Sequence, residues 1–424
     1  MIFSLSALRN ILYFAVTACF VTFINLRQSL PGHLYYARWN DTRRWYVVSI
    51  LFHLFLIGQV KNHVDDLSLR GYFDFEKYER KSEFGGVSLR NYPYKAVDFL
   101  IKENIKGNFF NDFNSGSYLL GKTFPNIKVY IDGRTEVHGS EFYKVYNDLI
   151  HGETKYFDEV VNRYHLTGAF LNSVYVPLPE KFLNYVYHRP DWKLIYFDHD
   201  AMIFLKDIPE NRVWIEKFAM DLSQWTPVRA DLLKYGVHPV DLYRYTIRAK
   251  VLFSVKLYDQ ALAELKEALR IMPNDVETYK LLTRIYHEKK QYDLQFEYAR
   301  KAKVLDPDDL EMRYYLAESA FELGDIELAE KQCMKILEID VHQVRTRLLM
   351  SRIYLGRDQA DQSLFIIKDI LKTEKLKFVD EILGIIDDFV EKKKYDQARE
   401  VYQLILSLDS THQMTLEHMQ RLPK

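Results

Sequence analysis

The chain has 424 residues, too many for one ordinary hydrophobic core, so two or three domains are expected. Its 58 basic and 59 acidic residues leave a formal net charge of -1, which disfavours nucleic acid as a partner. The 2 cysteines, Cys19 and Cys333, are too few for a disulfide framework or a thiolate metal site, and each is interpreted as a small hydrophobic side chain.

Two apolar runs predict a membrane segment with one or two transmembrane helices over residues 1–60. The first run, residues 2–26, is long enough to span a bilayer if Arg9 extends to the interface. The second run, residues 45–60, is shorter, and the arginine-rich loop between the two is typical of a cytoplasmic loop. A cleaved signal peptide and a pair of core helices in a soluble domain remain open as alternatives.

Short apolar runs alternate with helical stretches over residues 61–210, a pattern that predicts an extracytoplasmic α/β domain. Asp198, His199 and Asp200 form a turn-like cluster between the last two runs and predict a β-hairpin. Residues 211–241 are expected to form a linker region with helical character. The predicted strands cover residues 108–111, 128–132, 168–176, 193–197 and 201–206.

Two polar loops follow predicted strands, where a sheet can meet a ligand, and they supply the candidate ligand-binding residues Asp112, Asn114, Asp132 and Arg134. Asp132 and Arg134 could offer an acceptor and a bidentate donor to a sugar or a phosphate. In the structural alternative, Arg134 pairs with Asp132 or Asp112 and only fixes the loop. The scattered histidines lack metal-ligand spacing, so no metal and no cofactor are predicted.

The runs NYPYKAVDFL (91–100), GNFFNDFNSGSYLL (107–120) and KVYIDGR (128–134) carry a resemblance. They resemble the extracytoplasmic C-terminal domain of bacterial polytopic membrane proteins related to glycosyltransferases that use polyprenyl-phosphate sugars. This resemblance implies a location in the bacterial inner membrane, with the α/β domain and the residues after it outside the cytoplasm, and a glycan or lipid-linked sugar as a partner. Members have many membrane helices and an acidic catalytic residue in an early outside loop, whereas at most two helices are expected here. The resemblance therefore leaves the reaction unassigned.

Residues 242–413 repeat at an interval of 34 residues. Leu242, Val276, Leu310 and Val344 open successive units, and Val379 opens a fifth after one extra residue. Small residues recur where the paired helices must approach, and only Gln295 interrupts the second series. The series are Ala249, Thr283, Ala317 and Ser351 at position 8, and Ala261, Ala329, Ser363 and Ala398 at position 20. This pattern resembles the tetratricopeptide repeat and predicts an all-α solenoid of about five repeats, closed by a cap over residues 414–424.

Stacked repeats of this kind line a concave groove with their first helices. Positions 2, 5, 9 and 12 of the repeats are expected to face the groove and to bind a protein or peptide partner. The alternative is a solvated inner face without a ligand. The groove candidates are Lys250, Phe253, Lys280, Arg284, His287, Tyr314, Glu318, Phe321 and Arg352.

The sequence thus predicts a multidomain fold class: an N-terminal transmembrane hairpin, a small α/β domain and a C-terminal all-α tetratricopeptide repeat solenoid. The function expected first is a membrane-anchored adaptor, with no catalytic residue on this chain. The alternative is the C-terminal part of a glycosyltransferase whose catalytic membrane core lies elsewhere. A hydrolase that uses Asp132 is disfavoured, because no nucleophile elbow, phosphate loop or carboxylate pair accompanies it.

Overall fold

The computed structural model describes residues 73–74, 79–80, 92–172, 179–229 and 243–422. Two short strands, β1 (Phe73–Asp74) and β2 (Glu79–Arg80), come first. From residue 92 onward the described residues belong to one compact unit. The described part of the chain is mostly helical, with 17 α-helices, the two-stranded sheet of β1 and β2, and one mixed sheet of five strands.

The five-stranded sheet has the order β4-β3-β5-β7-β6. β3 is parallel to β4 and β5, whereas β7 is antiparallel to β5 and β6. Every predicted strand is found, although β4 ends at residue 129 and residues 173–176 lie outside the described ranges. The strands are β3 (Gly107–Asn111), β4 (Ile127–Val129), β5 (Leu166–Asn172), β6 (Trp192–Phe197) and β7 (Ala201–Lys206).

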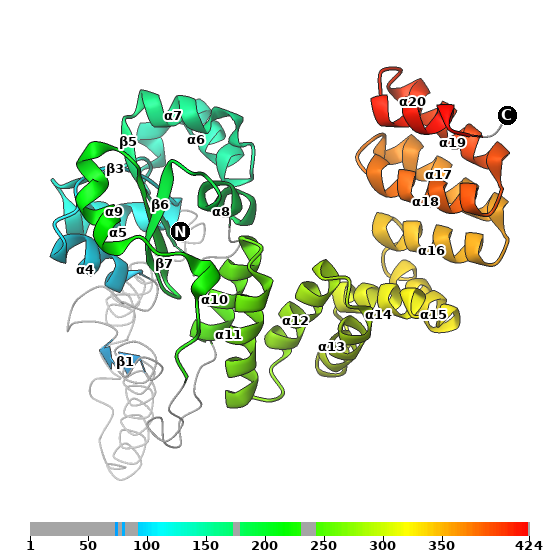
Figure 1. The fold of residues 1–424 in the computed structure, drawn as a ribbon, viewed down its shortest axis with the longest axis horizontal. Coiled ribbons are helices and arrows are strands. Elements are labelled where there is room, and N and C mark those ends of the chain that lie inside the picture. Colours follow the sequence, from blue (N-terminus) through cyan, green and yellow to red (C-terminus); the bar gives the residue numbers. More distant parts are fainter. Residues whose placement is uncertain (1–72, 75–78, 81–91, 173–178, 230–242, 423–424) are drawn as a thin grey trace, which may run out of the picture. The chain divides into compact units, whose positions relative to one another are not determined.

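Helices cover both faces of this sheet (Figure 1). Successive strand residues point to opposite faces, so Phe109 joins one core cluster and Phe110 the other. Because both faces are buried, the strands are rich in apolar residues, and β7 (AMIFLK) is apolar up to its last residue. One face packs on α4 (Tyr94–Lys102), α5 (Phe113–Thr123) and α9 (Arg212–Phe218), and the other on α6 (Thr135–Ile150), α7 (Phe157–Arg163) and α8 (Glu180–Tyr187).

A close contact joins the N-terminal end of α5 to the end of β4. The buried Asn111 amide accepts from the Tyr130 amide at 2.9 Å and donates to the Ile131 carbonyl at 2.7 Å. A Cβ atom on Gly116 would lie 2.0 Å from that same carbonyl oxygen. Glycine is therefore required at position 116, because any side chain would push α5 off the sheet.

The C-terminal part consists of helix pairs that follow one another along the chain (Figure 1). Four first helices begin at the predicted residues Val276, Leu310, Val344 and Val379, while Leu242 lies just outside the described ranges. The pairs are α10 (Tyr243–Ser254) with α11 (Tyr258–Ile271), α12 (Val276–Glu288) with α13 (Tyr292–Leu305), α14 (Leu310–Glu322) with α15 (Ile326–Leu337), α16 (Val344–Gly356) with α17 (Ala360–Glu374), and α18 (Val379–Glu391) with α19 (Tyr395–Leu408). The last helix, α20 (Gln413–Gln420), lies against α19 in the predicted cap region.

The small residues of the repeats are fully buried between paired helices. In the fourth pair the Ser351 and Ser363 hydroxyl oxygens lie 2.7 Å apart, so positions 8 and 20 meet directly. Gln295 is also fully buried, and its Nε2 donates to the Tyr315 carbonyl at 3.0 Å and to Glu318 at 2.9 Å. The larger side chain at position 20 thus reaches the next helix pair.

Part of the predicted linker packs on the first repeat. After the short 3-10 turn η7 (Leu222–Gln224), the Trp225 indole donates to the Glu264 carboxylate at 2.6 Å. The same carboxylate receives two hydrogen bonds from Arg248, at 2.7 and 2.8 Å. Both charged side chains are buried, and their mutual pairing offsets the cost of removing them from water. Residues 230–242 lie outside the described ranges.

The predicted fold class is wrong in its transmembrane hairpin. No helix among the described residues is both long and apolar enough to cross a membrane, and the longest of them, α6, has 16 residues where about 20 are needed. Residues 1–60, which carry both apolar runs, lie outside the described ranges. The predicted location in the bacterial inner membrane, with both domains outside the cytoplasm, is contradicted by the same finding.

Two glycines in α5 give a matched test of the contact between α5 and β4. Gly116→Ala is expected to lower the free energy of unfolding by about 1 to 3 kcal/mol, because the new Cβ has no space. Gly121→Ala, which meets no atom within 4 Å, is expected to raise it by up to about 1 kcal/mol. Urea denaturation followed by circular dichroism measures both, and equal stabilities would contradict the close approach.

Candidate functional site

The structure brings the two predicted loops together at the carboxyl ends of the parallel strands, through Asn111. Asp112 caps α5: one carboxylate oxygen accepts from the Ser115 amide at 2.9 Å, and the other accepts from the Asn172 amide at 3.0 Å. Burial raises the pKa of Asp112 above its ordinary value, although these hydrogen bonds oppose the shift. Asn114 is exposed on α5. Asp112 therefore holds β3, α5 and β5 together.

Asp132 is paired within its own loop. Its carboxylate accepts from the Arg134 guanidinium at 2.5 to 3.1 Å and from the Arg134 amide at 3.0 Å. The hydrogen bond from Arg134 lowers the pKa of Asp132 to about 2, against the opposing effect of burial. His138 Nε2 lies 3.6 Å from the same carboxylate. This geometry matches the structural alternative in which Arg134 fixes the loop.

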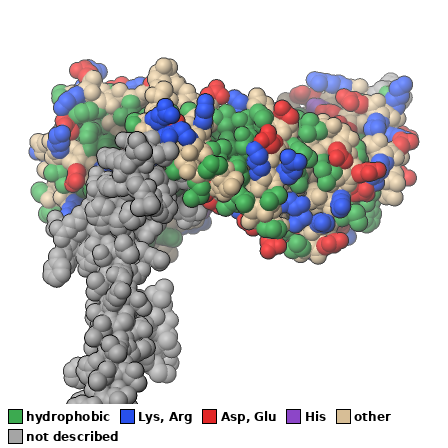
Figure 2. All heavy atoms as spheres, turned by 90° about the horizontal axis from the view of Figure 1, so that it is seen from below, with side chains coloured by type: hydrophobic (Ala, Val, Ile, Leu, Met, Phe, Trp, Pro, Cys, Tyr) green, Lys and Arg blue, Asp and Glu red, His purple; other side chains and the backbone are tan. Residues whose placement is uncertain are grey.

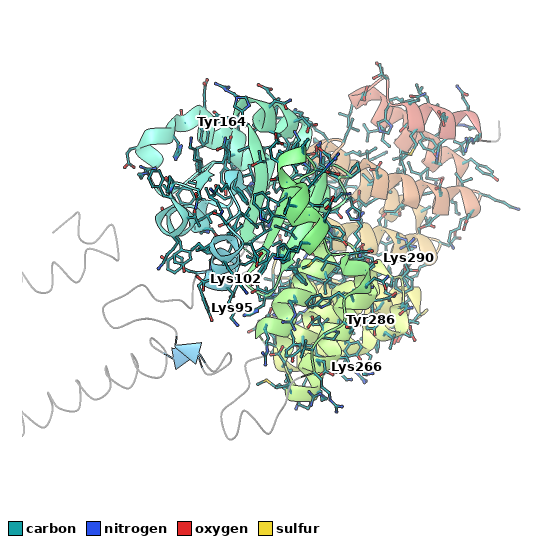
Figure 3. All side chains as sticks on the ribbon, turned by 60° about the vertical axis from the view of Figure 1, so that its left-hand side comes forward. Lys95, Lys102, Tyr164, Lys266, Tyr286 and Lys290 are labelled. Atoms are coloured by element: carbon teal, nitrogen blue, oxygen red, sulfur yellow. The ribbon has the colours of Figure 1, made fainter. Side chains whose placement is uncertain are left out.

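A cavity of about 770 Å³ lies beside this loop, where α6 is broken at Gly139 (φ 73°). The His138 ring stacks on Phe142 at 4.9 Å between centroids, and Tyr164, labelled in Figure 3, packs edge-on to Phe142. The cavity is lined by Tyr130, His138, Gly139, Ser140, Glu141, Phe142, Val145, Tyr156, Glu159, Val160, Arg163 and Tyr164. Its wall is therefore aromatic with charges of both signs, and of its residues only Tyr130 lies in a run that the sequence analysis singled out.

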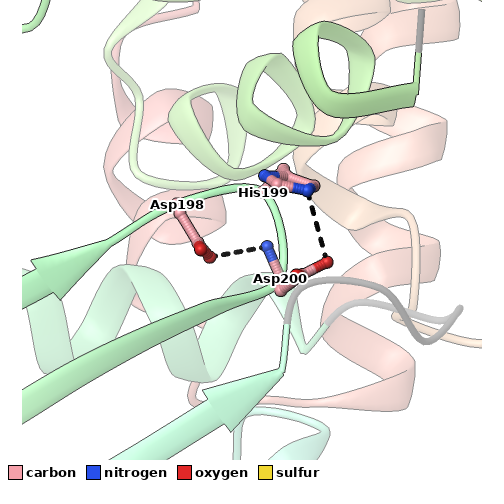
Figure 4. A group of neighbouring side chains, drawn as sticks. All are labelled: Asp198, His199 and Asp200. Carbon is pink, nitrogen blue, oxygen red and sulfur yellow. Dashed lines mark hydrogen bonds and ion pairs between the residues drawn. The ribbon is translucent and has the colours of Figure 1, made fainter. Parts of the chain in front are cut away.

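Asp198, His199 and Asp200 form the turn of the hairpin between β6 and β7, which confirms the predicted turn (Figure 4). Their possible ligand atoms lie within 4.8 Å of one another. The Asp198 carboxylate, however, accepts from the amides of Asp200 at 2.7 Å and Ala201 at 2.9 Å, and from the Tyr196 hydroxyl at 2.7 Å. These bonds close the turn and leave Asp198 little capacity to bind a cation.

The predicted lysines and arginines of the groove are paired with acids, most of which belong to a neighbouring helix pair. These pairs cross-link successive repeats instead of leaving charge for a ligand. Lys250 lies 3.7 Å from Glu277, Lys280 lies 2.8 Å from Asp306 and 2.6 Å from Asp309, Arg284 lies 2.8 Å from Glu311, and Arg352 lies 2.8 Å from Glu322 and 3.2 Å from Asp388. Phe253 packs near Tyr258, and Phe321 lies under the Arg352 guanidinium.

His287, Tyr314 and Glu318 form one polar network with Gln295. His287 Nδ1 lies 2.7 Å from Glu318, and Tyr314 donates to the other oxygen at 3.0 Å. Burial works against the charged form of His287, but the interaction with Glu318 outweighs it and raises the pKa of His287. Burial likewise disfavours ionised Glu318, yet these bonds keep its pKa below the ordinary value. Glu318 is thus ionised and already satisfied.

Four of the predicted groove residues, His287, Tyr314, Glu318 and Arg352, line a cavity of about 440 Å³. Arg345 lies on the same wall, is exposed, and makes no ion pair with any residue in the described ranges. Arg345 and Leu348 stand at positions 2 and 5 of the fourth repeat, so the positional rule applied to that repeat would have found them. The sequence prediction omitted the lining residues Arg345, Leu348, Leu349, Glu381, Gly384 and Ile385.

Charges on the described surface are mixed. Figure 2 shows acidic and basic side chains intermingled on the face in view, as the net charge of -1 leads one to expect. Such a surface creates no field of one sign that would gather a polyanion. The prediction that nucleic acid is not a partner rests on this balance.

The ion pair of Asp132 predicts a pH-dependent stability. Because its folded pKa of about 2 lies below an unfolded value of about 3.9, the carboxylate stabilises the fold above about pH 4 and loses this effect as the pH falls toward 2. Asp132→Asn is expected to lower the free energy of unfolding by only about 1 kcal/mol at pH 7. The effect is small because the Arg134 side chain is mostly exposed and water screens the ion pair. Urea denaturation of both proteins between pH 2 and pH 7 measures the difference, which should shrink at low pH; a constant difference would contradict the pairing.

No protein-family model matches the chain, and no curated protein matches it. Several solved structures are similar to the repeats. YrrB, a TPR protein with an unusual peptide-binding site, is 18% identical, with 42% of this chain and 92% of that chain covered and a TM-score of 0.35. PilF of Pseudomonas aeruginosa is 18% identical over 38% of this chain and 74% of that chain, with a TM-score of 0.32. TTC0263 of Thermus thermophilus is 16% identical over 42% of this chain and 97% of that chain, with a TM-score of 0.34.

The helix pairs provide the structural basis for assigning the fold. First helices begin at residues 276, 310 and 344. Buried small residues lie where each first helix contacts its partner helix, so that the two helices pack closely. The C-terminal part of this chain is a tetratricopeptide-like helical repeat.

Proposed function

We propose that this chain is an adaptor whose repeats bind an extended segment of another protein in the cavity between α14, α16 and α18. The single observation that carries the proposal is Arg345, a guanidinium on the cavity wall with no acidic partner in the described ranges. A guanidinium offers a planar fork of donors that fits a carboxylate. The other cations of the predicted groove are already paired within the chain.

The apolar floor of the cavity supports the same proposal. Leu348, Leu349 and Ile385 line it although each side chain is almost wholly buried, so a ligand would contact the packed core of the repeats. An apolar floor beside a single convergent charge is typical of a binding site for a peptide side chain. The proposal concerns the repeats alone and includes neither a membrane nor a lipid-linked sugar as a partner.

A catalytic function for Asp132 is disfavoured by its geometry. Both carboxylate oxygens are engaged by Arg134, and the low pKa makes this group a poor general base at neutral pH. A binding function requires no such group. The adaptor is therefore favoured over the hydrolase.

The test is selection of peptides by the full chain from a displayed random dodecamer library. Peptides that the chain enriches are expected to bind Arg345→Glu about 10 to 100 times more weakly, because a charge-assisted hydrogen bond is lost and a repulsive charge is introduced. Fluorescence anisotropy with labelled peptides measures the dissociation constants. Arg300→Glu is the matched control, because Arg300 is exposed on α13 and does not line this cavity.

Two outcomes would contradict the proposal. One is that the chain enriches no peptide above the background of the display. The other is that Arg345→Glu and Arg300→Glu bind the enriched peptides as tightly as the unchanged chain does.

A further inference from the structure

A glycine in the middle of a repeat helix leaves one wall of the groove cavity open. Gly384 lies within α18 (Val379–Glu391), is exposed and lines the cavity, and a Cβ built on it would meet no atom within 4 Å. A glycine inside a helix costs about 1 kcal/mol relative to alanine. Packing therefore does not require glycine at position 384, in contrast to Gly116.

What glycine does at position 384 is leave the apolar floor uncovered. Leu348 and Leu349 approach the cavity from α16 and Ile385 from α18, and a side chain on Gly384 would project into the cavity that they line. The cavity volume of about 440 Å³ exceeds the volume of any single side chain. A large side chain of a bound segment can therefore enter the cavity together with the residues next to it in that segment.

The rim of this opening carries one unpaired charge of each sign. Arg345 comes from α16 and Glu381 from α18, and neither makes an ion pair with a residue of the described ranges. The remaining charges of the lining are satisfied, since Arg352 is held by Glu322 and Asp388, and Glu318 is held by His287. The positive group thus stands on α16, the helix of Leu348 and Leu349, and the negative group stands on α18, the helix of Ile385.

We propose that the opening at Gly384 is a specificity pocket for a large apolar side chain of a separate protein, flanked in that partner by an acidic residue facing Arg345 and a basic residue facing Glu381. This inference rests on the proposed groove function and deepens it. The two rim charges fix the direction in which the segment lies, because reversing it would place like charges opposite each other.

The test is the sequence pattern of peptides that the full chain and its variants enrich from a random dodecamer library. The unchanged chain is expected to enrich Leu, Ile, Met, Phe or Trp at one position, with an acid on one side and a base on the other. Gly384→Phe fills the pocket and is expected to lose the apolar preference and to bind the enriched peptides at least tenfold more weakly. Arg345→Glu is expected to lose only the acid, and Glu381→Lys only the base.

The folding of each variant is checked by thermal unfolding. Gly384→Phe is expected to keep its stability, because phenylalanine is the better helix former and its Cβ would meet no atom within 4 Å. Gly121→Phe is the matched control: Gly121 is also an exposed helical glycine with no atom within 4 Å of its built Cβ, and it lies outside the repeats. This control is expected to enrich the same peptides as the unchanged chain.

The failure of the pocket and the failure of the groove give different results. Enriched peptides without an apolar consensus, or with a consensus that Gly384→Phe retains, overturn the pocket and leave the groove function in place. Enrichment of no peptide at all overturns both. Self-association of the chain that Gly384→Phe abolishes, without peptide enrichment, identifies a second copy as the occupant and overturns the proposal of a separate partner.

Discussion

The close approach of paired helices at small side chains is the constraint on which the repeats depend. In the first four pairs the two helices meet at Ala, Ser or Thr at positions 8 and 20, apart from Gln295, and in the fourth pair the hydroxyls of Ser351 and Ser363 touch. A larger side chain would separate the helices and shift every later pair, since each repeat rests only on its neighbours. Gln295 is tolerated because its amide extends into the next pair and is hydrogen-bonded there.

This packing also decides which charges remain for a ligand. Regular stacking places basic residues of one first helix beside acids at the start of the next pair, as in Arg284 with Glu311. Pairs of this kind satisfy each other, so a groove that is basic in sequence becomes nearly neutral in the structure. The ion pairs between repeats do not include Arg345 and Glu381, which make no ion pair with any described residue. Both residues line the cavity whose apolar floor is left open at Gly384.

The α/β domain follows a different principle, because its loops are held by buried polar side chains. The side chains of Asn111 and Asp112 form hydrogen bonds with the backbone in and beside neighbouring strands, and Asp132 forms an ion pair with Arg134. The hydrogen bonds of Asn111 and Asp112 link the carboxyl ends of β3 and β5 to the residues that follow β4 and to α5. The aromatic cavity beside the break at Gly139 is lined mainly by residues of α6 and by residues in and beside α7, and among the quoted loop runs only KVYIDGR contributes, through Tyr130.

The sequence alone determined the strands, the hairpin turn at Asp198 and the first residues of the repeat helices, because local propensity and hydrophobic period are read directly from residue order. Four of the ten residues that line the groove cavity, His287, Tyr314, Glu318 and Arg352, are among the predicted groove residues. Only the tertiary structure decided which charges are neutralised, because ion pairs such as Lys280 with Asp309 join residues from different repeats. Only the tertiary structure, too, distinguished Gly116, which packing requires, from Gly384, which faces open space, because residue order does not say what lies opposite a missing side chain.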